Sequence, residues 1–408
     1  MNPISPEYLQ KKLEEIGRLS FVAREIGISQ ATLSRIAHGK QMPSLEFANK
    51  INEFIERIEQ AGISTLKKKD KNKSPVAKKS VQPLQHPRDV LQGAQAGAVV
   101  LPVCDHYSGV QARMRKSLQL QAEMQQEFGV CVFDVTLDCE DGAPVGGEIE
   151  HAALVTELAL NAAANARVAV RVHPVDHPAF HADIASIVGK AGQRLCHVML
   201  PKVETVADIE HAVRAIDQAG APTLAVHALI ESPAAVHRAF DIAAHPRVQS
   251  LSFGLMDFVS AHAGAIPSHG MGAQGQFSHP LVLRAKMDIA SACHAHGKVP
   301  SHSVVTEFND TQAMENAARR ASQELGYTRM WSIHPAQIRP IVAAMTPDDK
   351  DIETACAVLL AAQQAEWAPI SHAGQLHDRA SYRFFWQLLQ RAQATGRKLP
   401  VEAQGFFA

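Results

Sequence analysis

The sequence predicts an α/β protein, a (β/α)8 TIM barrel preceded by a small all-α domain and followed by a C-terminal helical extension. Three observations lead to this prediction. Eight apolar, β-rich runs recur along the chain, and each interval between them accommodates a strand and a crossover helix. The first 60 residues show only short helical patterns, and amphipathic helical patterns return after the last run.

The apolar runs supply the strands of the predicted barrel. They occupy residues 98–103, 130–141, 166–172, 195–204, 224–232, 248–258, 298–305 and 330–335. A doubly wound open sheet is the alternative arrangement. Eight consecutive strand–helix units favour closure into a barrel.

Charge is distributed unevenly along the 408 residues. The net charge is −1 for the whole chain, zero for residues 1–63 and +6 for residues 64–80. We therefore predict an N-terminal domain over 1–63, a basic flexible linker over 64–92, the barrel over 93–345 and a helical extension or lid over 346–408. The lysine-rich linker serves either solubility or non-specific contact with nucleic-acid phosphates.

Composition excludes several classes of protein. Apolar residues make up 46% and charged residues 20%, which favours a packed core over disorder. No apolar run approaches the roughly 18 residues of a membrane-spanning helix. The N-terminus lacks the apolar core of a signal peptide, and the six cysteines are scattered. We therefore expect a cytoplasmic protein with reduced thiols and no membrane partner.

Residues 21–55 show a helix-turn-helix rhythm. Gly27 ends one apolar helix, and Ser29 is a natural N-cap for the next. The stretch resembles the repressor-like helix-turn-helix family, which implies DNA contacts through Gln30, Thr32 and Arg35 and a dimer that binds DNA with residues 1–80. An assembly module without a DNA role is the alternative, since a net charge of zero is low for a DNA-binding domain.

Ionisable residues follow the predicted strands where these end. The C-terminal ends of barrel strands form the catalytic face, so we predict that these side chains converge on one site. They are Asp138, Glu140, Asp141, Arg171, His173, Lys202, Glu204, Glu231, Asp257 and His334.

The mixture of groups indicates enolate chemistry. Glu231 and Asp257 follow neighbouring strands, so their carboxylates are expected to share Mg²⁺. Arg171 is suited to a carboxylate or oxyanion, and Gly254 would let backbone amides approach a ligand. A divalent ion and an arginine around a 2-oxo acid stabilise the enolate of aldol cleavage. A Schiff base on Lys202 is the less favoured alternative, because nearby acids keep the amine charged.

Six motifs carry a family resemblance over residues 130–345. They are LDCEDGAP (137–144), VRVHP (170–174), LPKVET (200–205), LIES (229–232), FGLMDF (253–258) and SIHPAQI (332–338). They resemble the HpcH/HpaI aldolase and citrate lyase β-subunit family, near its malyl-CoA lyase branch. The resemblance implies Mg²⁺ on Glu231 and Asp257, and Arg171 on the substrate. It also implies that Glu140 is a supporting acid. The substrate-binding groups would be Lys202 and the amides of Gly254, Leu255 and Met256.

A stretch from Gly374 to Asp378 precedes the last predicted helix. It resembles the family's segment that covers a neighbouring subunit's site. The resemblance implies that Asp378 is a catalytic acid or base and that the chain forms a homo-oligomer, a trimer or hexamer. An aspartate that only caps the helix is an equal alternative.

The chain departs from the family pattern in two places. Residues 99–110 lack the arginine that the family uses for coenzyme A, and His302 stands where an aspartate is common. The predicted function is an Mg²⁺-dependent carbon–carbon lyase acting on a 3-hydroxy acid or its CoA thioester and giving a 2-oxo acid such as glyoxylate, pyruvate or oxaloacetate. The alternative is a transcriptional regulator whose barrel senses such an acid without turnover.

Residues 261–279 contain four glycines and three histidines. We predict a mobile loop beside the active site. A histidine metal site is a minor alternative, because His262, His269, His279 and His302 lack a ligand spacing.

Overall fold

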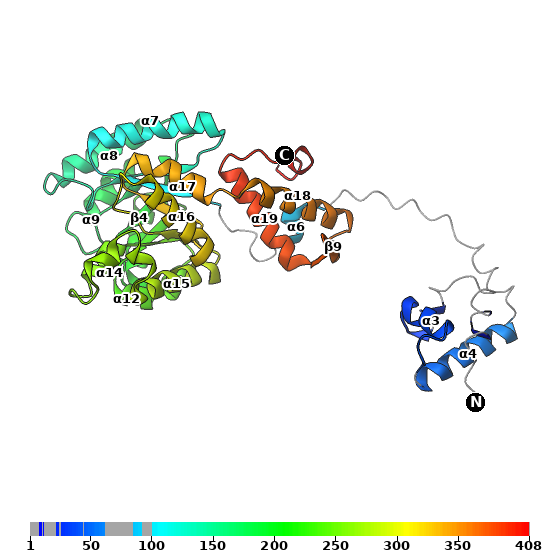
Figure 1. Cartoon of the computed structure of the whole chain (residues 1–408). Helices are drawn as coiled ribbons and strands as arrows, with labels where there is room; N and C mark the ends of the chain where they lie inside the picture. The colour runs from blue at the N-terminus through cyan, green and yellow to red at the C-terminus, as the bar shows by residue number, and fades with distance from the viewer. Residues whose placement is uncertain are drawn as a thin grey trace. The chain divides into compact units, whose positions relative to one another are not determined.

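The computed structural model describes residues 8–9, 11, 22–23, 26–43, 45–61, 85–91 and 100–407. The chain forms two compact units, residues 1–83 and 84–408 (Figure 1). Residues 85–91 of the predicted linker contain the short helix α6 (Pro87–Leu91), in which Pro87 and Leu91 are buried. The rest of the linker lies outside the described residues, so its flexibility stays a prediction.

The described part of the first unit contains the helix predicted after Ser29, α3 (Gln30–Ala37), and a further helix, α4 (Leu45–Ala61), whereas most of the helix predicted before Gly27 lies outside the described residues. Gly27 has φ +80°, the left-handed conformation that a tight turn requires, and the Ser29 hydroxyl accepts a hydrogen bond from the Thr32 amide at 3.0 Å. Leu33 is fully buried. These residues confirm the helix-turn-helix.

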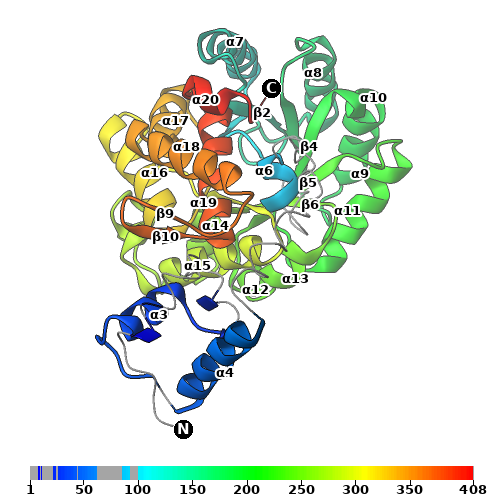
Figure 2. The ribbon, with the colours of Figure 1, turned by 90° about the vertical axis from the view of Figure 1, so that its right-hand side faces the viewer.

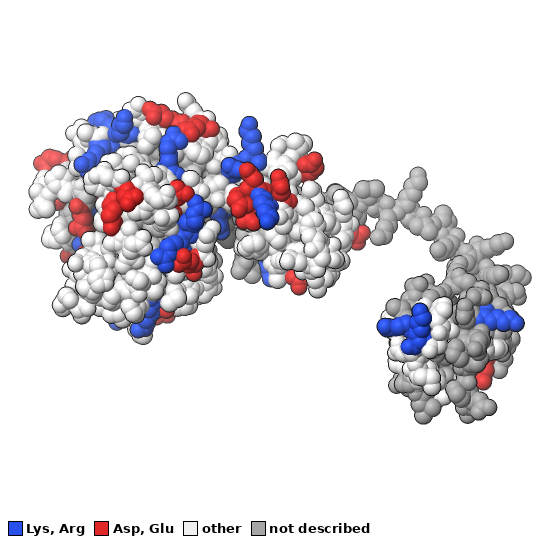
Figure 3. Space-filling model, viewed as in Figure 1, with Lys and Arg blue, Asp and Glu red and all other residues white. Residues whose placement is uncertain are grey.

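The side chains expected to contact DNA are only partly described. Thr32 is half-buried and Arg35 is exposed, whereas the Gln30 side chain lies outside the described part. Figure 3 shows basic side chains on the described surface of this unit. Those of Arg35, Lys40 and Lys50 are exposed.

The second unit contains a closed parallel barrel of eight strands in sequential order, in which β1 also pairs with β8. The strands are β1 (Cys104–Ser108), β2 (Phe133–Asp138), β3 (Val168–Arg171), β4 (Leu195–Leu200), β5 (Ala225–Ile230), β6 (Val248–Phe253), β7 (Val299–His302) and β8 (Arg329–Ser332). The predicted (β/α)8 barrel is confirmed.

Helices surround the strands, as Figure 1 shows from the side and Figure 2 after a 90° turn. They are α7 (Gln111–Phe128), α8 (Glu148–Asn161), α9 (Phe180–Asp183), α10 (Gly189–Ala191), α11 (Val206–Gln218), α12 (Pro233–His237), α13 (Ala239–Ala244), α14 (Leu255–Ser260), α15 (Pro280–Ala295), α16 (Thr311–Leu325) and α17 (Ile338–Met345). Their apolar faces pack on the outward strand residues in one large core.

The first strand differs from its prediction. The apolar run 98–103 is not the strand; β1 is the polar sequence CDHYS that follows it. Every residue of β1 is buried, because helices cover its outer face and the barrel interior accepts polar side chains. His106 contacts Ser117 of α7 and Ser332 of β8, whereas Asp105 contacts Thr136 and Arg329. Apolar runs therefore failed as a guide to this strand.

Alternation along the strands stacks inward side chains in three layers. A charged and polar layer contains Asp105, Asp134, His197, His227 and Arg329, all without exposed surface. An apolar layer comes next along the strands. It consists of Tyr107, Met199, Leu229, Val304 and Trp331. The third layer lies where the strands end, and there the predicted site residues begin.

The C-terminal residues form a helical group with a core of its own. It comprises α6 (Pro87–Leu91), α18 (Asp349–Gln364), the hairpin β9 (Ile370–His372) and β10 (Gln375–His377), α19 (Arg379–Ala394) and α20 (Val401–Gln404). Trp386 of α19 is almost fully buried in this core. Among the described residues, the helices are too short or too polar to cross a bilayer.

Candidate active site

A cavity of about 350 Å³ opens at the C-terminal ends of the strands. Predicted and unpredicted residues line it together. The lining includes Tyr107, Arg113, Asp138, Asp141, Arg171, Glu231, Gly254, Leu255, Met256, Asp257 and Trp331. A second cavity of similar volume lies between α19 and the opposite ends of the strands, and its lining includes none of the predicted site residues.

Arg171 ends β3 and is held by two carboxylates. Its Nε is 2.7 Å from Asp138 Oδ1, its Nη2 is 2.5 Å from Asp138 Oδ2, and its Nη1 is 3.0 Å from Glu140 Oε2. Burial by itself lowers the pKa of Arg171, but Asp138 and Glu140 outweigh it and raise the pKa. The guanidinium is therefore a fixed cation whose remaining N–H groups are available to a ligand.

Glu231 follows β5 and is buried beside Gly254, which follows β6. A Cβ on Gly254 would lie only 2.4 Å from both Cβ and Oε2 of Glu231. Burial raises the pKa of Glu231 to about 8, and the negative charge of Asp257 contributes to the shift. A buried carboxylate with a second carboxylate beside it fits a shared divalent cation.

Lys202 follows β4 and contacts the carboxylates of Glu231 and Glu140. Its backbone is in the left-handed region, with φ +52°, and its amide donates to Glu231 Oε1 at 2.6 Å. Its Nζ is 2.7 Å from Glu140 Oε1. Burial by itself lowers the pKa of Lys202, but the hydrogen bond with Glu140 and the neighbouring acids raise it. A charged amine is a poor nucleophile, so this environment disfavours a Schiff base.

Three strand-end residues face elsewhere. His173 Nδ1 contacts Asp183 Oδ2 at 2.7 Å, and the His334 ring caps the short helix at 335–337. Glu204 does not line the cavity either. The prediction that all the strand-end charges converge was therefore too broad, because His173 instead pairs with Asp183 and His334 caps the helix that follows its strand.

Other predicted residues also have local roles. The Gly254 amide donates to the Ile230 carbonyl at 3.0 Å, so this amide already has a partner, while Gly254 lines the cavity and its contact with a ligand stays a prediction. Asp378 caps α19, where its carboxylate accepts from the Ala380 amide at 2.9 Å. It does not line this chain's cavity. The capping alternative is thus observed, while a role in a neighbouring subunit stays a prediction.

The segment 261–279 and His302 lie outside the cavity lining. The segment contains two short 3₁₀ turns, Ser268–Met271 and Gly275–Phe277. Its Gln276 is buried and accepts from Lys286 Nζ at 2.7 Å and from Ser303. The His302 ring stacks on Phe277 at 5.2 Å between centroids. His302 is therefore not part of the cavity wall.

The cavity wall also contains residues that were not predicted, among them Tyr107, Arg113 and Trp331. The Arg171 guanidinium lies 5.3 Å from the centre of the Tyr107 ring, and Tyr107 packs on Trp331. Arg113, on the first turn of α7, also lines the cavity. Tyr107 could have been found from the alternation within CDHYS, and Arg113 from its place just after that strand.

A closed (β/α)8 barrel with acids and an arginine around its C-terminal cavity defines a class of barrel enzymes. The HpcH/HpaI aldolase/citrate lyase model matches residues 119–335, and a helix-turn-helix model matches residues 9–57. The chain therefore belongs to the HpcH/HpaI aldolase/citrate lyase family, and it is a carbon–carbon lyase with an N-terminal helix-turn-helix.

Curated relatives and solved structures agree with this assignment. The chain is 30% identical over 280 residues to an L-malyl-CoA/β-methylmalyl-CoA lyase of Cereibacter sphaeroides, covering 64% of this chain and 87% of the relative. A citrate lyase crystal structure from Burkholderia xenovorans is 49% identical with a TM-score of 0.67, covering 80% of this chain and all of that one. CitE from Mycobacterium tuberculosis, 22% identical with a TM-score of 0.55, covers 71% of this chain and 97% of its own and shares the fold.

Proposed function

We propose that the barrel is an Mg²⁺-dependent lyase for a 3-hydroxy acid carried as a CoA thioester, of the malyl-CoA type. The observation that carries this proposal is the juxtaposition of Glu231, Asp257 and the fixed Arg171 in one cavity. Curated relatives support the thioester, since two that are about 30% identical to this chain are malyl-CoA/β-methylmalyl-CoA lyases by name.

Most of the cavity residues would bind the part of the substrate that becomes the 2-oxo acid. Glu231 and Asp257 would hold Mg²⁺, which supplies positive charge to the oxygens of the 2-oxo acid half. Arg171 would bind its oxo or carboxylate oxygen through the N–H groups that Asp138 and Glu140 leave free. The backbone amides of Leu255 and Met256, in the first turn of α14, would bind the same acid.

Cleavage breaks the bond between the carbinol carbon and the carbon next to the thioester carbonyl. The hydroxyl loses its proton and becomes the oxo group of the 2-oxo acid. The bonding electron pair passes to the thioester half as an enolate, which then takes up a proton. Arg113 at the cavity entrance would attract the phosphates of coenzyme A and so compensate for the arginine missing from residues 99–110.

The test is cleavage of L-malyl-CoA and β-methylmalyl-CoA by the purified full chain with Mg²⁺, with glyoxylate as the measured product. Glu231→Gln should lower kcat/KM about 10³-fold, because it removes a metal ligand. Glu204→Gln is the matched control, since Glu204 also follows a strand but lies outside the cavity. Equal activity of wild type and Glu231→Gln would contradict the proposal. So would the absence of turnover of CoA thioesters and free 3-hydroxy acids.

We also propose that the helix-turn-helix binds DNA in a sequence-specific way, through Gln30, Thr32 and Arg35. Its match over residues 9–57 and the exposure of Arg35 support this. With DNA selected from a random pool, Arg35→Ala should weaken binding about tenfold, and Glu53→Gln, an exposed change on α4, should not. Binding that resists salt and ignores Arg35 would instead favour an assembly module.

DNA binding with no turnover of any substrate would favour the alternative of a regulator whose barrel only senses the acid. The lyase and DNA experiments therefore separate the two functions. The dimer expected on DNA and the trimer or hexamer expected for the barrel remain proposals, which sedimentation of the full chain would test.

A further inference from the structure

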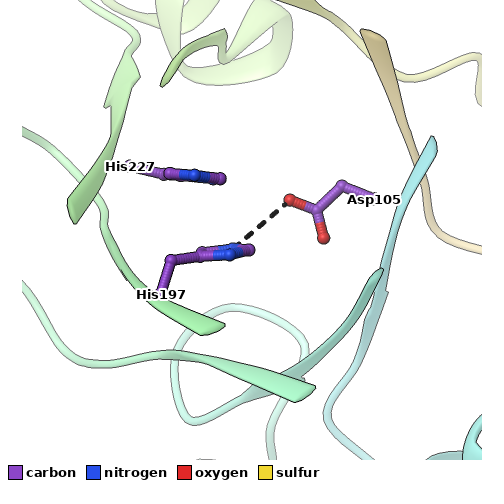
Figure 4. A group of neighbouring side chains, drawn as sticks. All are labelled: Asp105, His197 and His227. Atoms are coloured by element: carbon purple, nitrogen blue, oxygen red, sulfur yellow. Dashed lines mark ion pairs between the residues drawn. The ribbon is translucent and has the colours of Figure 1, made fainter. Parts of the chain in front are cut away.

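The charged layer beneath the active site contains a cluster that the proposed chemistry does not use. Asp105 comes from β1, His197 from β4 and His227 from β5, and none has exposed surface. Figure 4 shows the two imidazole rings stacked beside each other on one wall of the barrel and pointing toward the Asp105 carboxylate on the opposite wall. The three candidate ligand atoms all lie within 4.8 Å of one another.

The facing atoms of this cluster lack hydrogen-bond partners. These atoms are Asp105 Oδ2, His197 Nε2 and His227 Nδ1. Asp105 Oδ2 forms an ion pair with the Arg329 guanidinium at 2.9 Å and lies 3.7 Å from His197 Nε2. A buried polar atom without a partner costs about 1–3 kcal/mol, so the two imidazole nitrogens, which lack even the ion pair that Asp105 has, require an explanation.

Hydrogen bonds on the far sides of the rings set which nitrogens are free. His227 Nε2 lies 3.0 Å from Gln249 Oε1, and an amide oxygen only accepts. Nε2 therefore carries the hydrogen, and Nδ1 offers its lone pair to the cluster. His197 Nδ1 lies 3.4 Å from Cys196 Sγ, which leaves His197 Nε2 facing Asp105.

We propose that Asp105, His197 and His227 bind a divalent transition-metal ion, and that Zn²⁺ suits them best. Two imidazole nitrogens and one carboxylate oxygen are a ligand set for such ions, with a water in the fourth position. A cation satisfies several converging lone pairs at once, whereas a single water has only two hydrogens to donate. Mg²⁺ prefers oxygen ligands, so it belongs at Glu231 and Asp257 instead.

Surrounding groups orient the carboxylate, as partners of metal ligands generally do. Thr136 Oγ1 donates to Asp105 Oδ1 at 2.6 Å. The ion pair with Arg329 neutralises part of the negative charge of Asp105. The cluster therefore favours an ion that bonds strongly to nitrogen over an ion that is held by charge alone. The two rings stack with centroids 3.5 Å apart and planes 14° from parallel, so binding must tilt them until both nitrogens face the ion.

The ion would brace β1 against β4 and β5 across the barrel. Two residues further along these strands lie Tyr107, Met199 and Leu229 of the apolar layer. Glu231 follows Leu229 by two more residues, and Tyr107 contacts Arg171. A metal at this level would therefore stabilise the strands that position the active site, without touching the substrate.

The test measures metal content in the full chain produced with zinc and purified in Mg²⁺ buffer. Elemental analysis should find about one zinc per chain in the wild type and in Glu231→Gln, which lacks a ligand of the other site. His227→Gln and His197→Gln should lose that zinc. In a cobalt-substituted protein, nitrogen ligation should give visible absorption that His227→Gln abolishes.

His302→Gln is the matched control, because His302 is equally buried but faces Phe277 outside the cluster. It should keep the zinc. A Glu231→Gln protein without zinc or any other transition metal would overturn the proposal even if the histidine variants fail to fold. Zinc retained in folded His227→Gln would overturn it as well.

Discussion

At the scale of single residues, Gly254 and Glu231 show how closely the site depends on the absence of one carbon. A Cβ at residue 254 would collide with the Glu231 side chain. Since Glu231 is buried and its amide partner at Lys202 is already in a strained conformation, the carboxylate has little room to move.

We therefore expect Gly254→Ala to displace Glu231 and to lower both Mg²⁺ affinity and kcat/KM, by about tenfold or more. Gly189→Ala is the control, since the nearest atom to its added carbon lies at 3.9 Å and the residue has helical φ. Steady-state kinetics over a range of Mg²⁺ concentrations measures both effects. Unchanged kinetics in Gly254→Ala would remove Glu231 from the proposed metal site.

The raised pKa of Glu231 predicts a pH dependence of stability in metal-free protein. The folded state holds the proton more tightly than the unfolded state, so stability is lost as pH rises from the unfolded pKa through about 8. The loss should amount to a few kcal/mol, at about 1.4 kcal/mol per pKa unit.

Denaturant unfolding in chelator between about pH 5 and pH 9 tests this linkage. The free energy of unfolding of the wild type should fall relative to that of Glu231→Gln as pH rises, because glutamine has no proton to lose. Saturating Mg²⁺ should remove the difference. Parallel pH curves for the two proteins in chelator would mean that Glu231 ionises normally.

At the scale of elements, strand alternation and helix capping decide which role each polar side chain has. Along β5, His227 belongs to the charged layer, Leu229 to the apolar layer and Glu231 to the active site. Where a strand is followed directly by a helix, a polar side chain at the strand end can cap that helix, as His334 does. An ionisable residue after a strand is therefore a candidate for the site and for a cap.

Asp378 allows these two roles to be separated. Asparagine caps a helix about as well as aspartate, whereas alanine loses about 1 kcal/mol. Asp378→Ala should therefore lower the free energy of unfolding and Asp378→Asn should not. If Asp378 is also an acid or base, both variants should lose activity, by about 10²-fold or more. Full activity in Asp378→Asn would leave the cap as its role.

At the scale of the whole molecule, the separate hydrophobic cores indicate that functions are combined along one chain. The helix-turn-helix, the barrel and the C-terminal group each have their own cluster of buried apolar residues. Because Asp378 lies in the last of these and outside this chain's cavity, any catalytic role requires a second copy.

A mixing experiment tests that arrangement. Co-assembled Glu231→Gln and Asp378→Asn chains should regain activity, because one copy supplies an intact metal site and another supplies Asp378 across the subunit boundary. The recovered activity should match the fraction of sites in the mixed oligomers that combine an intact Glu231 from one chain with an intact Asp378 from another. If the two inactive variants stay inactive in verified mixed oligomers, Asp378 does not complete the active site of a second copy.

The sequence by itself determined the closed barrel, the helix-turn-helix, and Arg171, Glu231 and Asp257 as residues of one cavity. These features follow local rules, since strand periodicity, capping residues and strand ends can be read along the chain. The chain also announced its family through motifs at those strand ends.

Only the tertiary structure decided the location of β1, the cap roles of His334 and Asp378, and the meeting of Asp105, His197 and His227. These residues are far apart in the sequence, and β1 is polar because its buried side chains have partners on neighbouring elements, Asp105 with Arg329 and His106 with Ser117. Which polar side chains face one another depends on closure and register, and no local pattern records either.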